Sequence, residues 1–282
     1  MQIAVTGATG HLGSLIIESL LNRDVTPSDI TAIVRNEAKA ATLADRGVTI
    51  AVASYEDEAA LTAALEGVDR LMLVSGSEVG QRLAQHTNII NAAKTAGVGF
   101  IAYTSLLNLD TSELSLAPEH RGTEQLLADS GIDHALLRNG WYWENYASAL
   151  DSGRASGQFF GAAGAAQVSG AARRDYAQAA AVVVTGEGHA GKTYELAGSP
   201  SLSYPEIADE VGAVLGKDVA YVNQSVADYA VTLEGFGMPA PIAAMFAEMD
   251  PLIEKGALYS DSTDLEDLIA RPSTSVATAL KA

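Results

Sequence analysis

Residues 3–13 read IAVTGATGHLG, a short apolar run followed at once by three glycines spaced three apart. This pattern predicts a strand, a tight turn and the start of a helix. Gly7 suits the sharp turn, Gly10 lets the backbone approach a pyrophosphate, and Gly13 lets the helix pack against the strand. Backbone N–H groups at a helix N-terminus attract phosphate. We therefore predict a dinucleotide-binding turn; the alternative is a glycine turn that serves packing alone.

The composition is that of a globular chain with a substantial core, because 48% of the 282 residues are hydrophobic and 18% are charged. Acidic residues outnumber basic ones by 35 to 17, and the net charge of -18 repels nucleic acid phosphates and anionic membrane surfaces. We therefore expect no nucleic acid partner. The absence of cysteine excludes disulfides and thiolate catalysis.

Targeting and metal-binding patterns are absent from the sequence. The chain leads directly into its first predicted strand, and no apolar run approaches the ~20 residues of a membrane span. We therefore expect a cytoplasmic protein without membrane insertion. The histidines stand at positions 11, 86, 120, 134 and 189 without metal-ligand spacing, so we predict no metal site.

Strand-like and helix-like segments alternate through the first half of the chain. Regular alternation of this kind specifies a parallel sheet with helices on both faces. We therefore predict an α/β fold of the Rossmann type, with a doubly wound parallel sheet. After the first strand, we expect strands over 29–34, 48–52, 71–74, 100–104 and 134–138, helices over 12–21, 37–46, 57–65, 81–96 (ending at Gly97) and 119–129, and a loop over 105–118.

The alternation changes after Arg138. Ser203 and Glu206 have the spacing of a capping box, which predicts a helix that continues to Leu215. We predict a dinucleotide-binding domain over 1–138 plus 173–198, and a smaller, mostly helical substrate-binding lobe from 139–172 and 199–282. The other expected elements are loops with short strands over 153–172, a helix over 175–185, strands over 192–196 and 219–222, and a helical remainder with breaks at 237, 241 and 256.

Seven short stretches distributed over nearly the whole chain carry a family resemblance. They are residues 4–10, 32–36, 77–82, 101–106, 137–142, 194–198 and 271–274. In these stretches the sequence resembles the NmrA-like group of atypical short-chain dehydrogenase/reductase proteins, and within it the flavin-independent type 2 NAD(P)H:quinone oxidoreductases. The resemblance implies a nicotinamide cofactor that passes hydride directly to a quinone or a similar flat conjugated acceptor, without flavin or metal.

The cofactor is expected to lie across the ends of several predicted strands. Arg35 ends the second strand, where a cation accommodates a 2′-phosphate, so we predict NADP(H) rather than NAD(H). A solvated strand-end arginine is the alternative. The glycine turn (Gly7, Ala8, Thr9, Gly10, His11, Leu12, Gly13) is expected at the pyrophosphate, Ser75, Gly76 and Ser77 at the adenosine and ribose by resemblance, and Tyr103, Thr104 and Ser105 at the nicotinamide ribose. The Ser-Gly stretch also suits a simple turn.

The proton-transfer pair of most short-chain dehydrogenases, Tyr-x-x-x-Lys, is missing. Tyr103 is followed four residues later by Leu107, and the expected helix carries His120-Arg121-Gly122-Thr123-Glu124 instead. Carbonyl chemistry then loses its general acid, whereas a quinone accepts hydride readily and takes its proton from water or a weak donor. We name His120 as the candidate catalytic proton donor. The alternative is a structural hydrogen bond near the start of the helix.

An aromatic and amide cluster over 139–145 is predicted to form the wall of the nicotinamide and substrate site. Its aromatic rings can stack on a flat acceptor, and its amides can donate and accept hydrogen bonds. The alternative is that the aromatics only close the sheet over the smaller lobe. We assign Asn139, Gly140 and Trp141 to the cofactor and Tyr142, Trp143 and Asn145 to the substrate, and by resemblance Arg173 rather than Arg174 to the cofactor.

The sequence thus predicts an NADPH-dependent quinone reductase. Reduction of a triphenylmethane dye is a close variant, because such a dye is also a flat conjugated hydride acceptor. A second hypothesis is an NADP-binding redox sensor without turnover, which the missing Tyr-x-x-x-Lys also fits. The sequence leaves open whether the protein forms a homodimer.

Overall fold

The computed structural model describes residues 1–281, which are organised around one central parallel sheet. The seven strands lie in the order β3-β2-β1-β4-β5-β6-β9, and every neighbouring pair is parallel. This confirms the predicted Rossmann-type α/β fold. The strands are β1 (Ile3–Val5), β2 (Ile30–Val34), β3 (Thr49–Val52), β4 (Arg70–Leu73), β5 (Phe100–Leu106), β6 (Asp133–Asn139) and β9 (Thr193–Leu196).

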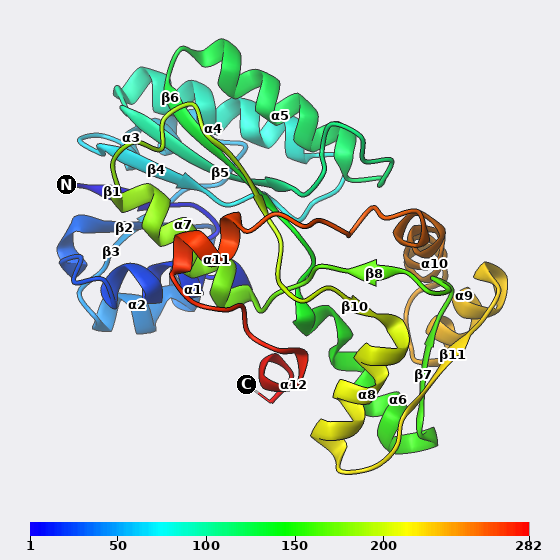
Figure 1. Ribbon diagram of the computed structural model, residues 1–282. Helices are drawn as coiled ribbons and strands as arrows, with labels where there is room; N and C mark the ends of the chain where they lie inside the picture. Colours follow the sequence, from blue (N-terminus) through cyan, green and yellow to red (C-terminus); the bar gives the residue numbers. More distant parts are fainter. Residues whose placement is uncertain (282) are drawn as a thin grey trace.

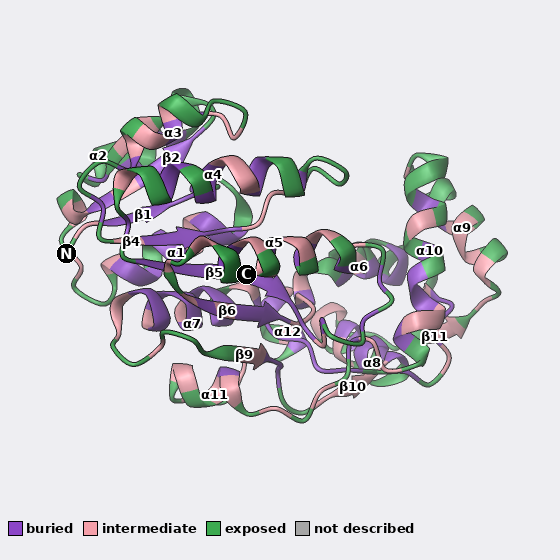
Figure 2. Ribbon diagram, turned by 90° about the horizontal axis from the view of Figure 1, so that it is seen from above, coloured by how far each residue is buried: buried purple, intermediate pink, exposed green. Residues whose placement is uncertain are grey.

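Helices cover both faces of the sheet (Figure 1). One face packs on α1 (His11–Leu21), α2 (Ala41–Asp45), α7 (Arg173–Thr185) and α11 (Asp264–Ile269), and the other on α3 (Glu58–Ala64), α4 (Arg82–Ala96) and α5 (Ala117–Ser130). Strand β1 feeds both cores because its side chains alternate: Ile3 and Val5 belong to one core and Ala4 to the other. Strands β1, β4 and β5 form the buried middle of the sheet, whereas β3 and β9 at its two edges are only partly buried (Figure 2).

A third hydrophobic cluster lies beyond the carboxyl ends of the strands, in the part of the chain that contains α6, α8 and α12 (Figure 2). It is rich in aromatic side chains, including Trp143, Tyr146, Phe159 and Tyr204. We call this part the second lobe. Its elements are η3 (Trp143–Tyr146), α6 (Ala147–Ser156), β7 (Gln158–Gly161), β8 (Gln167–Val168), β10 (Leu202–Ser203), α8 (Tyr204–Leu215), β11 (Ala220–Asn223), α9 (Val226–Gly235), α10 (Ala240–Glu254) and α12 (Val276–Ala279).

Several predicted boundaries were wrong, and each error has a local cause. Strand β5 continues to Leu106 because residues 104–106 pair with β6, so the loop that was expected from 105 starts later. Residues 153–156 belong to α6 rather than to a loop. Pro241 lies in the first turn of α10, where a helix tolerates proline, and does not break it. The expected helix over 37–46 divides into η2 (Glu37–Ala40) and α2, and a further short turn, η1 (Pro27–Asp29), precedes β2.

The sheet reverses its winding between β1 and β4, which are neighbours in space although Val5, at the end of β1, and Arg70, at the start of β4, are 65 residues apart in the sequence. In open α/β sheets a ligand crevice forms at such a switch point, outside the carboxyl ends of the strands. The topology therefore directs attention to the turn after β1 and the loop after β4. Within residues 1–281, no helix has both the length and the apolar character that crossing a membrane requires.

Candidate cofactor and active site

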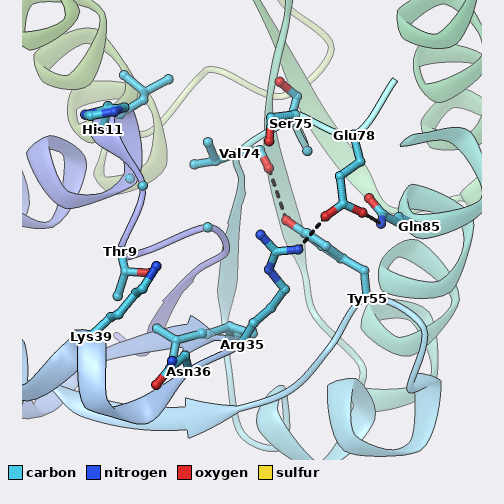
Figure 3. A pocket seen from close by; sticks show the side chains of 18 of the residues that line it. Thr9, His11, Arg35, Asn36, Lys39, Tyr55, Val74, Ser75, Glu78 and Gln85 are labelled. Atoms are coloured by element: carbon cyan, nitrogen blue, oxygen red, sulfur yellow. Dashed lines mark hydrogen bonds and ion pairs between the residues drawn. The ribbon is translucent and has the colours of Figure 1, made fainter. Parts of the chain in front are cut away.

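A cavity of about 520 Å³ lies at this switch point (Figure 3). It is bordered by the glycine turn after β1, the residues after β2, the loop after β4 and two side chains near the start of α7 and the second lobe. The residues that line it and were predicted from the sequence are Gly7, Thr9, Gly10, His11, Leu12, Gly13, Arg35, Ser75, Gly76, Ser77, Tyr142 and Arg173.

The glycine turn is as tight as its sequence suggests. Gly7 adopts a positive φ of +57°, and the Gly10 N–H donates to the Gly7 carbonyl over 2.8 Å. A Cβ at Gly13 would stand 2.2 Å from the Gly7 carbonyl oxygen, which no side chain tolerates. Ala8 is fully buried beneath the turn and does not line the cavity. Gly7 is therefore required by the backbone conformation of the turn, and Gly13 by close packing of the helix.

The N-terminus of α1 is open toward the cavity. Gly10 is its N-cap, has no side chain to close the helix, and no carboxylate stands in the first turn. The first N–H groups of a helix have no partner within the helix and carry a partial positive charge. This end of α1 is therefore suited to a pyrophosphate, and its residues fit the predicted cofactor.

Cationic and amide groups gather at the outer corner of the cavity, where β2 ends. Arg35, Asn36 and Lys39 line it, and the guanidinium of Arg35 extends across to Glu78, with 2.5 Å between Nη1 and Oε1 (Figure 3). Two cations at the end of the second strand match the demands of an adenosine 2′-phosphate. Below them, the Tyr55 hydroxyl donates to the Val74 carbonyl over 3.2 Å, and burial raises the pKa of this phenol to about 12.

The loop after β4 is held from behind by buried polar side chains. The Ser75 N–H donates to Thr104 Oγ1 over 2.8 Å, and the Gly76 N–H donates to His86 Nε2 over 3.2 Å. Arg82 Nε in turn donates to the Gly76 carbonyl over 2.8 Å. Burial, with the charge of Arg82, lowers the pKa of His86 to about 3, so this ring is a neutral acceptor at ordinary pH. Thr104 thus reaches the cavity only through the loop that it positions.

The structure does not bring Tyr103, Ser105 and His120 to the cavity. The Tyr103 hydroxyl lies 2.7 Å from His120 Nδ1, and both residues are buried between β5 and α5. Burial, the charge of Arg82 and the neighbouring His86 lower the pKa of His120 to about 3. Ser105 Oγ donates to Glu124 over 2.5 Å. The surroundings of His120 are those of the alternative interpretation, a structural hydrogen bond near the start of α5.

Tyr142 and Arg173 form the inner wall of the cavity. The Arg173 guanidinium lies 5.1 Å from the centre of the Tyr142 ring, and Nη2 donates to Asn145 Oδ1 over 3.1 Å. The Glu144 carboxylate accepts from the Arg173 N–H, which closes the start of α7. An aromatic face, a cation and an amide are therefore adjacent here.

The remaining predicted wall residues lie behind that surface. Trp143 is buried in the second lobe, where its Nε1 donates to the Thr274 carbonyl over 3.1 Å, and Trp141 packs against the same cluster. Asn139 is buried beside Tyr142, and its Oδ1 is one of two buried side-chain atoms without a partner among residues 1–281. A Cβ at Gly140 would stand 3.0 Å from the Leu196 carbonyl oxygen. Arg174 bonds Thr274 rather than lining the cavity.

Sequence reasoning missed several residues that line the cavity. Asn36 and Lys39 follow Arg35 closely, so their position after the second strand was an available signal. Glu78 directly follows the predicted Ser77, which was also an available signal, whereas Tyr55 and Gln85 come from other segments that no local pattern indicates. Across residues 1–281, no group of three or more acidic or histidine side chains is arranged to hold a metal ion.

Comparison with known proteins identifies a family and several similar reductases. The profile of the NmrA-like family matches residues 1–281. The chain is 53% identical over 276 residues to quinone oxidoreductase 2 of Escherichia coli (strain K12), which covers 98% of this chain and 96% of that protein. The crystal structure of the Escherichia coli NADPH-dependent quinone oxidoreductase complexed with NADPH gives a TM-score of 0.95 at 52% identity, over 99% of both chains. Triphenylmethane reductase from Citrobacter sp., complexed with NADP(H), gives a TM-score of 0.95 at 36% identity, also over 99% of both.

Proposed function

This chain belongs to the NmrA-like family, and from that premise we propose that it is an NADPH-dependent quinone reductase. It passes hydride directly to a quinone or a similar flat conjugated acceptor, without flavin or metal. The observation that carries the proposal is the likeness to a quinone oxidoreductase at 53% identity over 98% of the chain. The cavity at the switch point supports it independently, because its open helix N-terminus and its cationic corner suit NADPH.

Each part of the cavity has a role in binding under this proposal. The first turn of α1 holds the pyrophosphate, and Arg35 with Lys39 holds the 2′-phosphate. The loop Ser75–Ser77, positioned through Thr104 and His86, supports the adenosine and ribose. When bound, the cofactor supplies the hydride, and the residues of the chain bind and orient it.

The acceptor side is proposed at Tyr142 and Arg173, next to the second lobe, which we propose as the substrate-binding lobe of 139–172 and 199–282 without α11, since that helix packs on the sheet. A phenol ring beside a guanidinium offers a flat face for a ring and a cation for a developing negative oxygen. Reduction of a quinone to a hydroquinone takes one hydride and one proton. Because His120 is buried away from the cavity, we propose water as the direct proton donor.

The test is NADPH oxidation by the purified protein, followed by absorbance, with a panel of quinones and one cationic triphenylmethane dye. We expect turnover of quinones without added flavin or metal, and a primary isotope effect when the transferred hydrogen of NADPH is deuterium. Heat-denatured protein is the control. Binding of NADPH without oxidation by any acceptor would instead support the redox sensor.

The same assay tests His120 as the proton donor. If His120 serves only as a structural partner of Tyr103, His120→Gln lowers the melting temperature but leaves kcat within about twofold. If it transfers the proton, kcat falls roughly a hundredfold and its pH profile changes, in line with the typical contribution of a general acid.

A further inference from the structure

The cavity contains an ion pair that lies where the 2′-phosphate is proposed to bind. Arg35 comes from the end of β2 and Glu78 from the loop after β4, and their side chains meet between these two walls (Figure 3). The pair is exposed, with 65% of the Arg35 side chain and 44% of the Glu78 side chain accessible to solvent. It is therefore open to exchange with a ligand.

Glu78 is held in this position by a second contact. Its other carboxylate oxygen accepts from Gln85 Nε2 over 2.7 Å, and the same amide nitrogen donates to Glu56 Oε1 over 2.9 Å. These hydrogen bonds and the neighbouring Arg35 lower the pKa of Glu78, so the group is ionised at neutral pH. Gln85 thus holds two carboxylates, Glu56 and Glu78, together, and Arg35 contacts the second of them.

The charges at this corner oppose each other when a phosphate arrives. A phosphate monoester brings a charge of about -1.5 to -2 at neutral pH, and it requires the guanidinium that Glu78 occupies. The phosphate of NADPH therefore competes with Glu78 for Arg35 Nη1 and meets the negative charge of that carboxylate. NADH has a 2′-hydroxyl instead, which leaves the ion pair intact. This hydroxyl can donate a hydrogen bond to a carboxylate.

We propose that Glu78 is a specificity-determining residue, an internal competitor for Arg35 that reduces the preference of this protein for NADPH over NADH. The inference rests on the proposed cofactor site and deepens it. Arg35 and Lys39 create the preference for the phosphate, and Glu78 limits it. The chain thereby retains measurable affinity for NADH in a site whose cations favour NADPH.

The test compares the dissociation constants of NADPH and NADH by calorimetry for the full chain and for Glu78→Gln, which keeps the size and the amide contacts. Because an exposed ion pair contributes modestly, we expect NADPH to bind about threefold more tightly to Glu78→Gln. NADH is expected to bind equally or more weakly. The ratio of the two constants therefore rises at least about threefold.

Two controls separate competition from a general change of charge. Glu56→Gln removes the same charge from a neighbour that shares Gln85 but does not contact Arg35, and we expect less than half of the effect on the ratio. In Arg35→Ala, the added Glu78→Gln should no longer tighten NADPH binding. A ratio that is unchanged or lower in Glu78→Gln, as for a carboxylate that binds both cofactors alike, overturns the inference and leaves the proposed function standing. No binding of NADPH to the unmodified chain overturns both.

Discussion

Helices α1 and α8 have 11 and 12 residues, but they begin in opposite ways. The start of α8 is closed by a complete capping box, in which Ser203 accepts from the Glu206 N–H and the Glu206 carboxylate accepts from the Ser203 N–H. The start of α1 has only Gly10, without a side-chain cap or an acidic residue. A helix that closes its own N–H groups is structural, whereas one that leaves them open beside a cavity is available to an anion.

The surroundings of the two starts differ as well. The first residue of α8, Tyr204, is buried, and its hydroxyl donates to Asp250 Oδ1 over 3.2 Å. Asp250 Oδ2 accepts from the Ala162 N–H over 2.6 Å, and burial raises the pKa of this carboxyl to about 6. The part of the chain around the central sheet, which includes α1, instead contains buried His86 in α4 and His120 in α5, whose pKa values burial lowers to about 3. Lowering the pH therefore stabilises the second lobe through Asp250 and destabilises the part around the central sheet through the two histidines.

The largest expected effect comes from adding one methyl group to α1. In Gly13→Ala the new Cβ would stand 2.2 Å from the Gly7 carbonyl, so the turn or the helix must move. We expect a loss of about 3 kcal/mol in the free energy of unfolding, the upper end for overpacking, together with weaker NADPH binding. Urea unfolding and calorimetry measure the two quantities.

The matched control for that change is Gly235→Ala, at the end of α9 in the second lobe. A Cβ there has no atom within 4 Å, so the variant should gain about 0.5 kcal/mol from reduced backbone entropy. Equal effects of the two substitutions would contradict the assignment of Gly13 to close helix packing.

The second expected effect is the pH dependence of the buried acid at α8. The pKa of Asp250 is about 6 in the folded chain, against 3.8 for an aspartate in water, so the folded form binds the extra proton. Stability from this group therefore falls as pH rises from about 4 to about 6, and then stays level. Asp250→Asn removes the charge, but its amide nitrogen cannot accept the hydrogen bond that one carboxylate oxygen accepts. We therefore expect its stability relative to the unmodified chain to be about 3 kcal/mol higher above pH 7 than below pH 4.

His86 and His120 give the free energy of unfolding the opposite dependence on pH. Their pKa values are about 3 in the folded chain, against 6.5 for a histidine in water, so stability is full above pH 6.5 and is lost progressively toward pH 3. The difference between Asp250→Asn and the unmodified chain cancels this shared slope. Urea unfolding across pH 4–8 measures that difference, and a constant difference would contradict a protonated Asp250. The exposed Asp151→Asn is the control.

Local patterns predicted the starts of both helices because each depends on residues close together in the chain. The spacing of Ser203 and Glu206 indicated the capping box, and the spacing of Gly7, Gly10 and Gly13 indicated the open turn. The end of β5 was mispredicted because pairing with β6, 33 residues away between paired Phe100 and Asp133, decides it. Strand length in a sheet depends on neighbours that a local reading does not contain.

The predicted site residues separate for the same physical reason. Side chains of a strand alternate between faces, so Tyr103 and Ser105 both point to α5, while Thr104 between them points to Ser75. Three consecutive strand residues therefore cannot all line one cavity. Glu78 meets Arg35 across 43 residues of sequence, and only the fold brings this pair together.

The smallest expected effect is also the one that tests the comparison most directly, because it gives α1 the kind of start that α8 has. Gly10→Asp places a carboxylate at the N-cap, where it accepts hydrogen bonds from the open N–H groups. Its negative charge is also attracted by the positive end of the helix dipole. We expect the free energy of unfolding to rise by about 0.5 kcal/mol. NADPH should bind roughly tenfold more weakly, a loss of about 1.4 kcal/mol in binding free energy, because the carboxylate occupies the N–H groups and repels the pyrophosphate.

Two controls decide what such a result means. Gly10→Ala adds the same Cβ, 3.1 Å from the Gly7 carbonyl oxygen, without a charge, so it isolates the steric part of the change. Ser203→Ala opens the start of α8 and should cost about 1 kcal/mol of stability while leaving NADPH affinity unchanged. If Gly10→Asp stabilises the fold and leaves the affinity for NADPH unchanged, the open N-terminus of α1 is not where the phosphates bind. If Gly10→Asp, unlike both controls, raises stability and lowers the affinity for NADPH, the unpaired N–H groups of α1 serve to bind the ligand.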